Sequence, residues 1–129
     1  MNKLNPRSPI ARARGLGSAK EGVEHWWAER VTAIALVPLT IWFAASIMAV
    51  AGGDHAAFVA WLGSPLSSVC MVVLLIALFY HTALGLQVVI EDYVHSGAKT
   101  PLLVAIRLGC FALATAGIVA TLRVGLAGG

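Results

Sequence analysis

The chain has 129 residues, of which 59% are hydrophobic and only 12% are charged, with a net charge of +3 and a mean hydropathy of +0.84. A soluble domain carries about twice this charged fraction. The composition therefore excludes an ordinary soluble enzyme and leaves too little chain outside a membrane for a separate catalytic domain. Nucleic acid is excluded as a partner, because most basic residues lie beside an apolar segment, where they set membrane orientation.

A basic segment, residues 1–24, opens the chain and is expected in the cytoplasm. Its first acidic residue is Glu21, and it contains no apolar core of its own. It is therefore not a secretory signal, although the same composition also fits a short transit peptide.

Residues 25–127 are predicted to form an all-α membrane domain with three transmembrane helices. The expected spans cover about residues 29–51, 65–92 and 101–125, each with the roughly 20 apolar residues that cross a bilayer. Pro38 lies inside the first span. A mild kink is expected there, since neighbouring helices can satisfy the carbonyl that proline leaves free.

Two pairs of residues indicate where the second and third helices begin. Ser64-Pro65 and Thr100-Pro101 each place a good N-cap residue before a proline suited to the first helical position. Between the first two spans, residues 54–63 contain Phe58 and Trp61. These aromatic side chains are expected to anchor a short segment at the membrane interface.

The third span carries small residues at a spacing of three and four, which places them along one stripe of a helix. Such a stripe allows close helix packing in a membrane, so this face is expected to lie against another helix. Its members are Ala105, Gly109, Ala112, Ala116 and Ala120.

The distribution of Lys and Arg predicts the orientation of the chain. Six precede the apolar run of the first span, which starts at Val31, and none lies between the first and second spans. Lys99 and Arg107 flank the loop between the second and third, and Arg123 is near the end of the chain. The positive-inside rule puts the N-terminus and this second loop in the cytoplasm and the C-terminus in the periplasm.

His81 lies within the second span, after an apolar run from Met71 to Tyr80. An ionisable residue at membrane depth is costly and usually functional. Gly85 lies one turn further along the same stripe and leaves a flat space suited to a planar macrocycle. A neutral imidazole nitrogen is a common axial ligand of heme iron. Three interpretations stay open from these residues: heme ligation, a structural hydrogen bond to a neighbouring helix, and a proton relay or ion site.

A heme at His81 would need a ligand from a second polypeptide if it has two histidine ligands. The other histidines, His25, His55 and His95, all fall at or outside the predicted membrane edges. The chain alone can therefore supply only one axial histidine at this depth.

Polar and aromatic residues gather where the second span reaches the cytoplasm. Tyr93 is typical of an aromatic belt, but beside Asp92 it could also donate a hydrogen bond to a quinone carbonyl. At the start of the first span, Arg30 is either a positive-inside charge or a partner for an anionic group such as a heme propionate. Interfacial tryptophans and His25 precede it.

These residues form two blocks that resemble the hydrophobic membrane-anchor D subunit of succinate dehydrogenase, respiratory complex II. The resemblance covers roughly residues 22–127 and includes three spans in matching order. The blocks are His25-Trp26-x-x-Glu29-Arg30-Val31 and His81-x-x-x-Gly85-x-Gln87-Val88-Val89-x-x-Asp92-Tyr93-Val94-His95.

The resemblance implies half of a two-subunit helical bundle that holds one heme b between two anchor subunits. It gives His81 the role of heme axial ligand, Tyr93 with Asp92 a quinone-contacting role, and Arg30 with His25 a place near the heme propionates or the quinone. The implied partners are a second anchor of the cytochrome b556-type C subunit, an iron–sulfur subunit, a flavoprotein subunit, ubiquinone and membrane lipid.

The implied function is that of a membrane anchor in succinate:ubiquinone oxidoreductase, in the tricarboxylic acid cycle and aerobic electron transport, in a bacterial inner membrane. Such a subunit has no succinate site of its own. The alternatives are a passive anchor without heme and a small multi-span transporter. The transporter is disfavoured because no charged residue occurs between Arg30 and Asp54.

Overall fold

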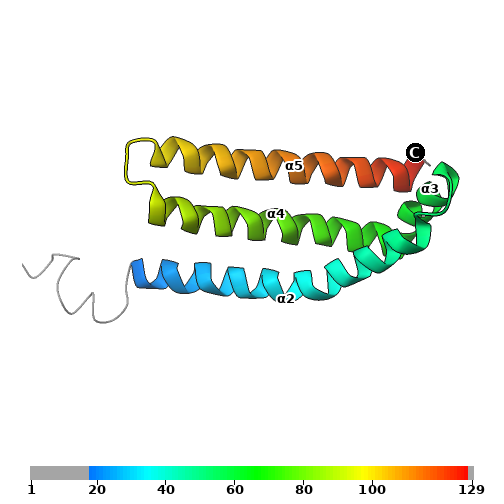
Figure 1. Ribbon diagram of the computed structural model, residues 1–129, viewed down its shortest axis with the longest axis horizontal. Helices are drawn as coiled ribbons and strands as arrows, with labels where there is room; N and C mark the ends of the chain where they lie inside the picture. The colour runs from blue at the N-terminus through cyan, green and yellow to red at the C-terminus, as the bar shows by residue number, and fades with distance from the viewer. Residues whose placement is uncertain (1–17, 128–129) are drawn as a thin grey trace, which may run out of the picture.

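The computed structural model describes residues 18–127, and every regular element in that range is a helix. Three helices are long and apolar enough to cross a membrane. They lie side by side and run in alternating directions (Figure 1). The predicted all-α architecture with three spans is confirmed, while most of the basic N-terminal segment lies outside the described residues. The helices are α2 (Ser18–Val50), α3 (His55–Gly63), α4 (Pro65–Tyr93) and α5 (Lys99–Ala127).

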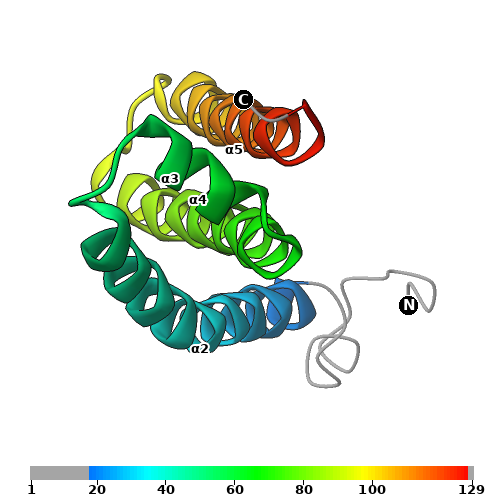
Figure 2. The ribbon, with the colours of Figure 1, turned by 90° about the vertical axis from the view of Figure 1, so that its right-hand side faces the viewer.

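The observed helix ends match the expected spans closely for α4 and α5 but not for α2. Helix α2 begins at Ser18, well before the first predicted span at about residue 29. Hydropathy identifies the part of a helix that lies in lipid, and a helix can extend beyond that part into the aqueous phase. Pro38 lies inside α2, which curves along its length (Figure 2).

The connection between α2 and α4 contains a helix of its own that is longer than one turn. It forms the nine-residue helix α3, capped at its start by the Asp54 carboxylate, which accepts a hydrogen bond from the Ala57 amide at 2.9 Å. Trp61 stacks on Trp42 of α2 with ring centroids 5.9 Å apart. Ser64 is the N-cap residue of α4, as predicted, but its hydroxyl donates to the Trp61 carbonyl at 2.8 Å.

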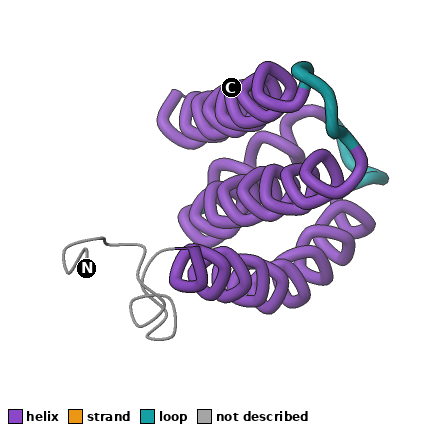
Figure 3. Tube along the Cα trace, turned by 90° about the vertical axis from the view of Figure 1, so that its left-hand side faces the viewer, coloured by secondary structure: helices purple, strands orange, loops and turns teal. Residues whose placement is uncertain are grey.

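Helix α4 is the central helix of the bundle. Of the five buried hydrophobic residues in the described part of the chain, four lie on it: Leu74, Ala77, Leu84 and Ile90. Helices α2 and α5 pack on α4 from either side and do not contact each other (Figures 2 and 3). The core is therefore thin, and many large apolar side chains on the outer helices are exposed, as expected for surfaces that meet lipid or partner subunits.

Helix α5 contacts α4 through a different face from the one predicted. The five small residues of the predicted stripe, from Ala105 to Ala120, are all exposed. The packed face contains Gly117, where an added Cβ would lie 3.0 Å from Leu75 Cδ1, and Thr121, which is 3% exposed. The stripe therefore meets no helix within the described part of this chain, and its packing against another helix stays a prediction.

Candidate functional site

His81 lies past the middle of α4, toward its C-terminal end, and contacts α2 through a hydrogen bond. Its Nδ1 atom is 2.9 Å from the hydroxyl oxygen of Thr32. Thr32 is one of the few buried polar residues, with 9% of its surface exposed. The structural hydrogen bond to a neighbouring helix, one of the three interpretations of His81, is thus present. Because it uses only one ring nitrogen, it leaves the other available for a ligand.

The space along the helix from His81 suits a flat group. Gly85 follows one turn later, and a Cβ placed on it would have nothing within 4 Å among the described residues. A side chain at this position would project into that open space. The residues present therefore fit a planar macrocycle beside His81, with a neutral imidazole as the donor that heme iron accepts.

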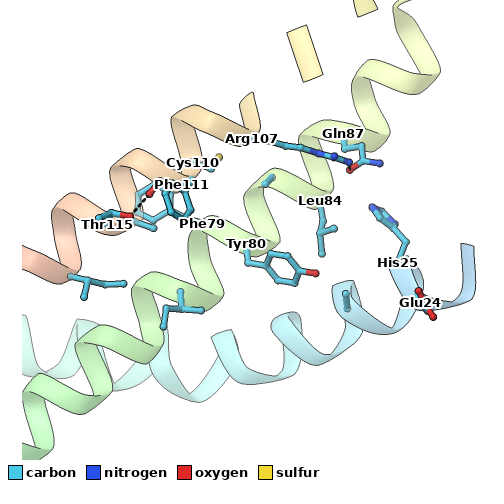
Figure 4. Close-up of a pocket in the computed structure, with 15 residues that line it drawn as sticks. Glu24, His25, Phe79, Tyr80, Leu84, Gln87, Arg107, Cys110, Phe111 and Thr115 are labelled. Carbon is cyan, nitrogen blue, oxygen red and sulfur yellow. Dashed lines mark hydrogen bonds between the residues drawn. The ribbon is translucent and has the colours of Figure 1, made fainter. Parts of the chain in front are cut away.

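A groove lies over another face of α4, between α2 and α5. Its volume is about 670 Å³ and its lining is largely apolar. Arg107 of α5 reaches across it and donates a hydrogen bond to the Gln87 side-chain oxygen at 2.8 Å (Figure 4). Gln87 in turn donates to Glu91 at 2.9 Å. Arg107 is thus held by α4 through Gln87, near the end of the bundle that carries the loop between α4 and α5.

His25 and Arg30, which the sequence places together, lie on different faces of α2. His25 lines the groove and points toward α4 (Figure 4). Its Nε2 atom is buried and has no hydrogen-bond partner within the described range. Arg30 is exposed, with its guanidinium 5.2 Å from the centre of the Trp26 ring. Five residues along a helix correspond to about 140° of rotation, which separates the two side chains.

Asp92 and Tyr93 lie in the last turn of α4, at the same end of the bundle as the start of α2. Both are exposed, and Tyr93 is 81% exposed. Within residues 18–127 neither side chain has a hydrogen-bond partner. The Tyr93 phenol and the Asp92 carboxylate therefore face outward from the chain. Any binding site that includes them needs contacts from other molecules.

Sequence reasoning missed Thr32 and the bond between Gln87 and Arg107. Thr32 lies 49 residues from His81, so spacing along the chain could not pair them. A signal was present for Gln87 and Arg107, because polar side chains within apolar helices tend to bond with one another. Across residues 18–127, no three His, Cys, Asp or Glu residues gather into a metal-ligand cluster.

The fold and these contacts define an integral membrane helical bundle with a histidine inside its central span. Residues 4–120 match the family described as the succinate dehydrogenase/fumarate reductase transmembrane subunit. The chain belongs to this family, as a membrane anchor subunit of succinate dehydrogenase.

Individual relatives agree with this assignment. A succinate dehydrogenase hydrophobic membrane anchor subunit from Rickettsia bellii is 35% identical over 103 residues, which cover 79% of this chain and 82% of the relative. The subunit of the same name from Paracoccus denitrificans is 30% identical over 119 residues, which cover 92% of each chain. No solved structure matches this chain significantly.

Proposed function

We propose that this anchor subunit helps to bind heme b and to form the ubiquinone-reduction site of succinate:ubiquinone oxidoreductase. The observation that carries the proposal is the geometry at His81. One ring nitrogen bonds Thr32 at 2.9 Å, and the glycine one turn away leaves open space beside the helix. A purely structural histidine needs the hydrogen bond to Thr32 but does not need the open space beside Gly85.

In this proposal His81 is one of two axial histidines of the heme. The other three histidines belong to different places: His25 is near the start of α2, His55 begins α3, and His95 follows the end of α4. The second ligand would come from the other anchor subunit, of the cytochrome b556-type C class. When bound, the heme supplies reversible one-electron chemistry.

Arg30 and His25 would serve different groups, since they lie on different faces of α2. The exposed Arg30 guanidinium is available to a heme propionate, for which a charge-assisted hydrogen bond is the expected contact. His25 faces the groove between α2 and α5, so it would not share the propionate with Arg30 and would be the one of the two available to the quinone.

The quinone would be reduced next to Asp92 and Tyr93. Electrons from succinate would arrive through the flavoprotein and iron–sulfur subunits, which we propose dock at this end of the bundle. Tyr93 would donate a hydrogen bond to a carbonyl oxygen of the quinone, and Asp92 would be close enough to influence its protonation. The high exposure of Tyr93 supports a site that partner subunits complete.

The proposed location is a bacterial inner membrane, with the N-terminus in the cytoplasm and the C-terminus in the periplasm. The start of α2 and the loop between α4 and α5 lie at one end of the bundle (Figure 1). Lys99 and Arg107 lie at that end, while the α2–α4 connection at the opposite end carries no Lys or Arg. This asymmetry supports the orientation through the positive-inside rule.

Replacing His81 tests the proposal in the assembled complex. In His81→Ala we expect the b-heme absorption bands to shift or disappear, since the iron loses a ligand. The matched control is His55→Ala, which removes an exposed histidine at the start of α3 and should leave the bands unchanged. Wild-type bands in His81→Ala would refute the ligand role.

One observation favours a second candidate, a passive anchor without heme. The Thr32–His81 hydrogen bond is what a purely structural histidine would make. The two candidates differ in the absorption spectrum of the purified wild-type complex, because a passive anchor would give no b-type bands.

A further inference from the structure

Thr32 has an unusual position for a hydroxyl in a membrane span, because its oxygen lies within hydrogen-bond distance of three other atoms. The Ala28 carbonyl oxygen is 2.7 Å away, the Glu29 carbonyl oxygen is 3.1 Å away, and His81 Nδ1 is 2.9 Å away. The side chain is nearly buried between α2 and α4. The three contacts together constrain where the protons are.

The hydroxyl has one proton, and the two carbonyl oxygens can only accept. If the hydroxyl donates to Ala28, its oxygen is free to accept a hydrogen bond from His81 Nδ1–H, and every group is satisfied. If it instead donated to Nδ1, the hydroxyl and Ala28 oxygens would face each other at 2.7 Å without a proton between them. The first arrangement is therefore the favourable one.

A second threonine on the same helix shows that this hydroxyl orientation does not depend on the histidine. Thr40 donates to the Leu36 carbonyl at 2.6 Å and contacts the Val37 carbonyl at 3.1 Å, with no third partner within the described range. Donation to the carbonyl four residues earlier is a common habit of helical threonine. The helix thus fixes the hydroxyl proton, and His81 must donate to the oxygen that remains.

We infer that Thr32 is a positioning residue that holds His81 as the Nδ1–H tautomer and leaves Nε2 bare for the heme iron. This inference rests on the proposed heme role of His81. A neutral histidine binds a metal through its unprotonated nitrogen. Metal-ligating histidines commonly donate the other ring N–H to a fixed acceptor, which orients the ring and raises its basicity.

Threonine variants of the assembled complex test the inference. Thr32→Val keeps the shape and removes the hydroxyl, so heme transfer to excess apomyoglobin should be about 10–100-fold faster. The heme midpoint potential should also rise, because a less basic imidazole stabilises the ferric iron less. Thr32→Ser, which keeps the hydroxyl, should restore both values. Thr40→Val, the matched control, should leave both unchanged.

The outcomes separate this inference from the proposed function. If His81→Ala loses the heme bands but Thr32→Val matches Thr40→Val in transfer rate and potential, the positioning role is refuted and the ligand role stands. If His81→Ala keeps wild-type bands, both are refuted. If Thr32→Ser behaves like Thr32→Val, packing rather than the hydroxyl is responsible, and the inference fails. Thr32→Ala carries the same expectation as Thr32→Val should the valine variant not assemble.

Discussion

The two ends of the bundle satisfy their polar side chains in different ways. Toward the start of α2, side chains bond to side chains across helices, as in Thr32 with His81 and Arg107 with Gln87. Toward α3, polar side chains bond to backbone carbonyls, as in Ser68 with the Leu62 carbonyl at 2.6 Å. Across residues 18–127, every hydrogen bond between two side chains lies in the first region.

The two ends of the bundle also differ in how closely their helices pack. Nearer the α3 end, glycine backbones of α5 lie close to side chains of α4: a Cβ on Gly117 would lie 3.0 Å from the Leu75 side chain, and one on Gly125 would lie 3.2 Å from the Ser68 hydroxyl. At the other end, the groove between α2 and α5 stays open and Gly85 faces empty space. One end is thus built for stability within the chain, and the other keeps polar groups and space that ligands or partners can use.

The largest effect on stability is expected at the closely packed end. Gly117→Leu would force a bulky side chain against Leu75 and should destabilise the subunit by about 1–3 kcal/mol, the usual cost of overpacking. The measurement is the thermal unfolding midpoint of the detergent-solubilised complex. The b-heme bands of the proposed site should not change before unfolding, because Gly117 lies on α5, whereas the contact that holds His81 is made by Thr32 of α2.

Gly109 gives the matched control for this prediction. A Cβ at Gly109 meets nothing within 4 Å among the described residues, so Gly109→Leu should be tolerated by the chain itself. Equal destabilisation by both variants would contradict the division into a packed end and an open end, and would indicate that a partner helix covers the exposed stripe of α5.

Tyr93→Phe should affect activity rather than stability. Loss of the proposed hydrogen bond from the phenol to the quinone should lower quinone reduction about tenfold, which corresponds to about 1.4 kcal/mol in the transition state. Succinate oxidation by an artificial acceptor should be unaffected, because that reaction bypasses the quinone. The measurement is the ratio of the two activities in membranes.

Tyr80→Phe is the control, because Tyr80 is on the same helix and lines the groove instead. It should leave the ratio of activities at its wild-type value. If Tyr80→Phe lowers quinone reduction and Tyr93→Phe does not, the groove rather than the end of α4 would be the quinone site.

The smallest effect is expected for the bond between Arg107 and Gln87. A double-mutant cycle with Arg107→Met and Gln87→Met should give a coupling energy of about 0.6 kcal/mol, the average for hydrogen bonds between membrane helices. The measurement is again the unfolding midpoint of the solubilised complex. A coupling energy of zero would mean that this contact does not stabilise the open end.

The sequence predicted the three spans well because each is a long apolar run, and α4 and α5 end within two residues of their predicted bounds. It did not predict the start of α2 at Ser18, since helix formation outside lipid leaves no hydropathy signal. It did not show that α5 meets α4 through a face other than the predicted stripe. Two faces of that helix carry small residues, and spacing alone cannot say which one meets α4.

For the candidate site, the sequence singled out His81 by its cost in a membrane and Gly85 by its place on the same stripe, and their role there stays a prediction. It grouped His25 with Arg30 because they are close in the chain, but helical rotation puts them on different faces. The partner of His81 could not be found at all. Thr32 is an ordinary residue of an apolar helix until α2 and α4 are placed side by side, and only the tertiary fold does that.

The short helix α3 has a mechanical consequence. It contacts all three long helices at one end of the bundle, while α2 and α5 have no contact with each other anywhere along their length. Away from α3, α2 and α5 are therefore joined only through α4, by contacts that include Thr32 with His81 and Arg107 with Gln87. The far ends of α2 and α5 flank the groove and the last turn of α4. A molecule that binds there would therefore change the distance between α2 and α5 more easily than any other distance in the subunit.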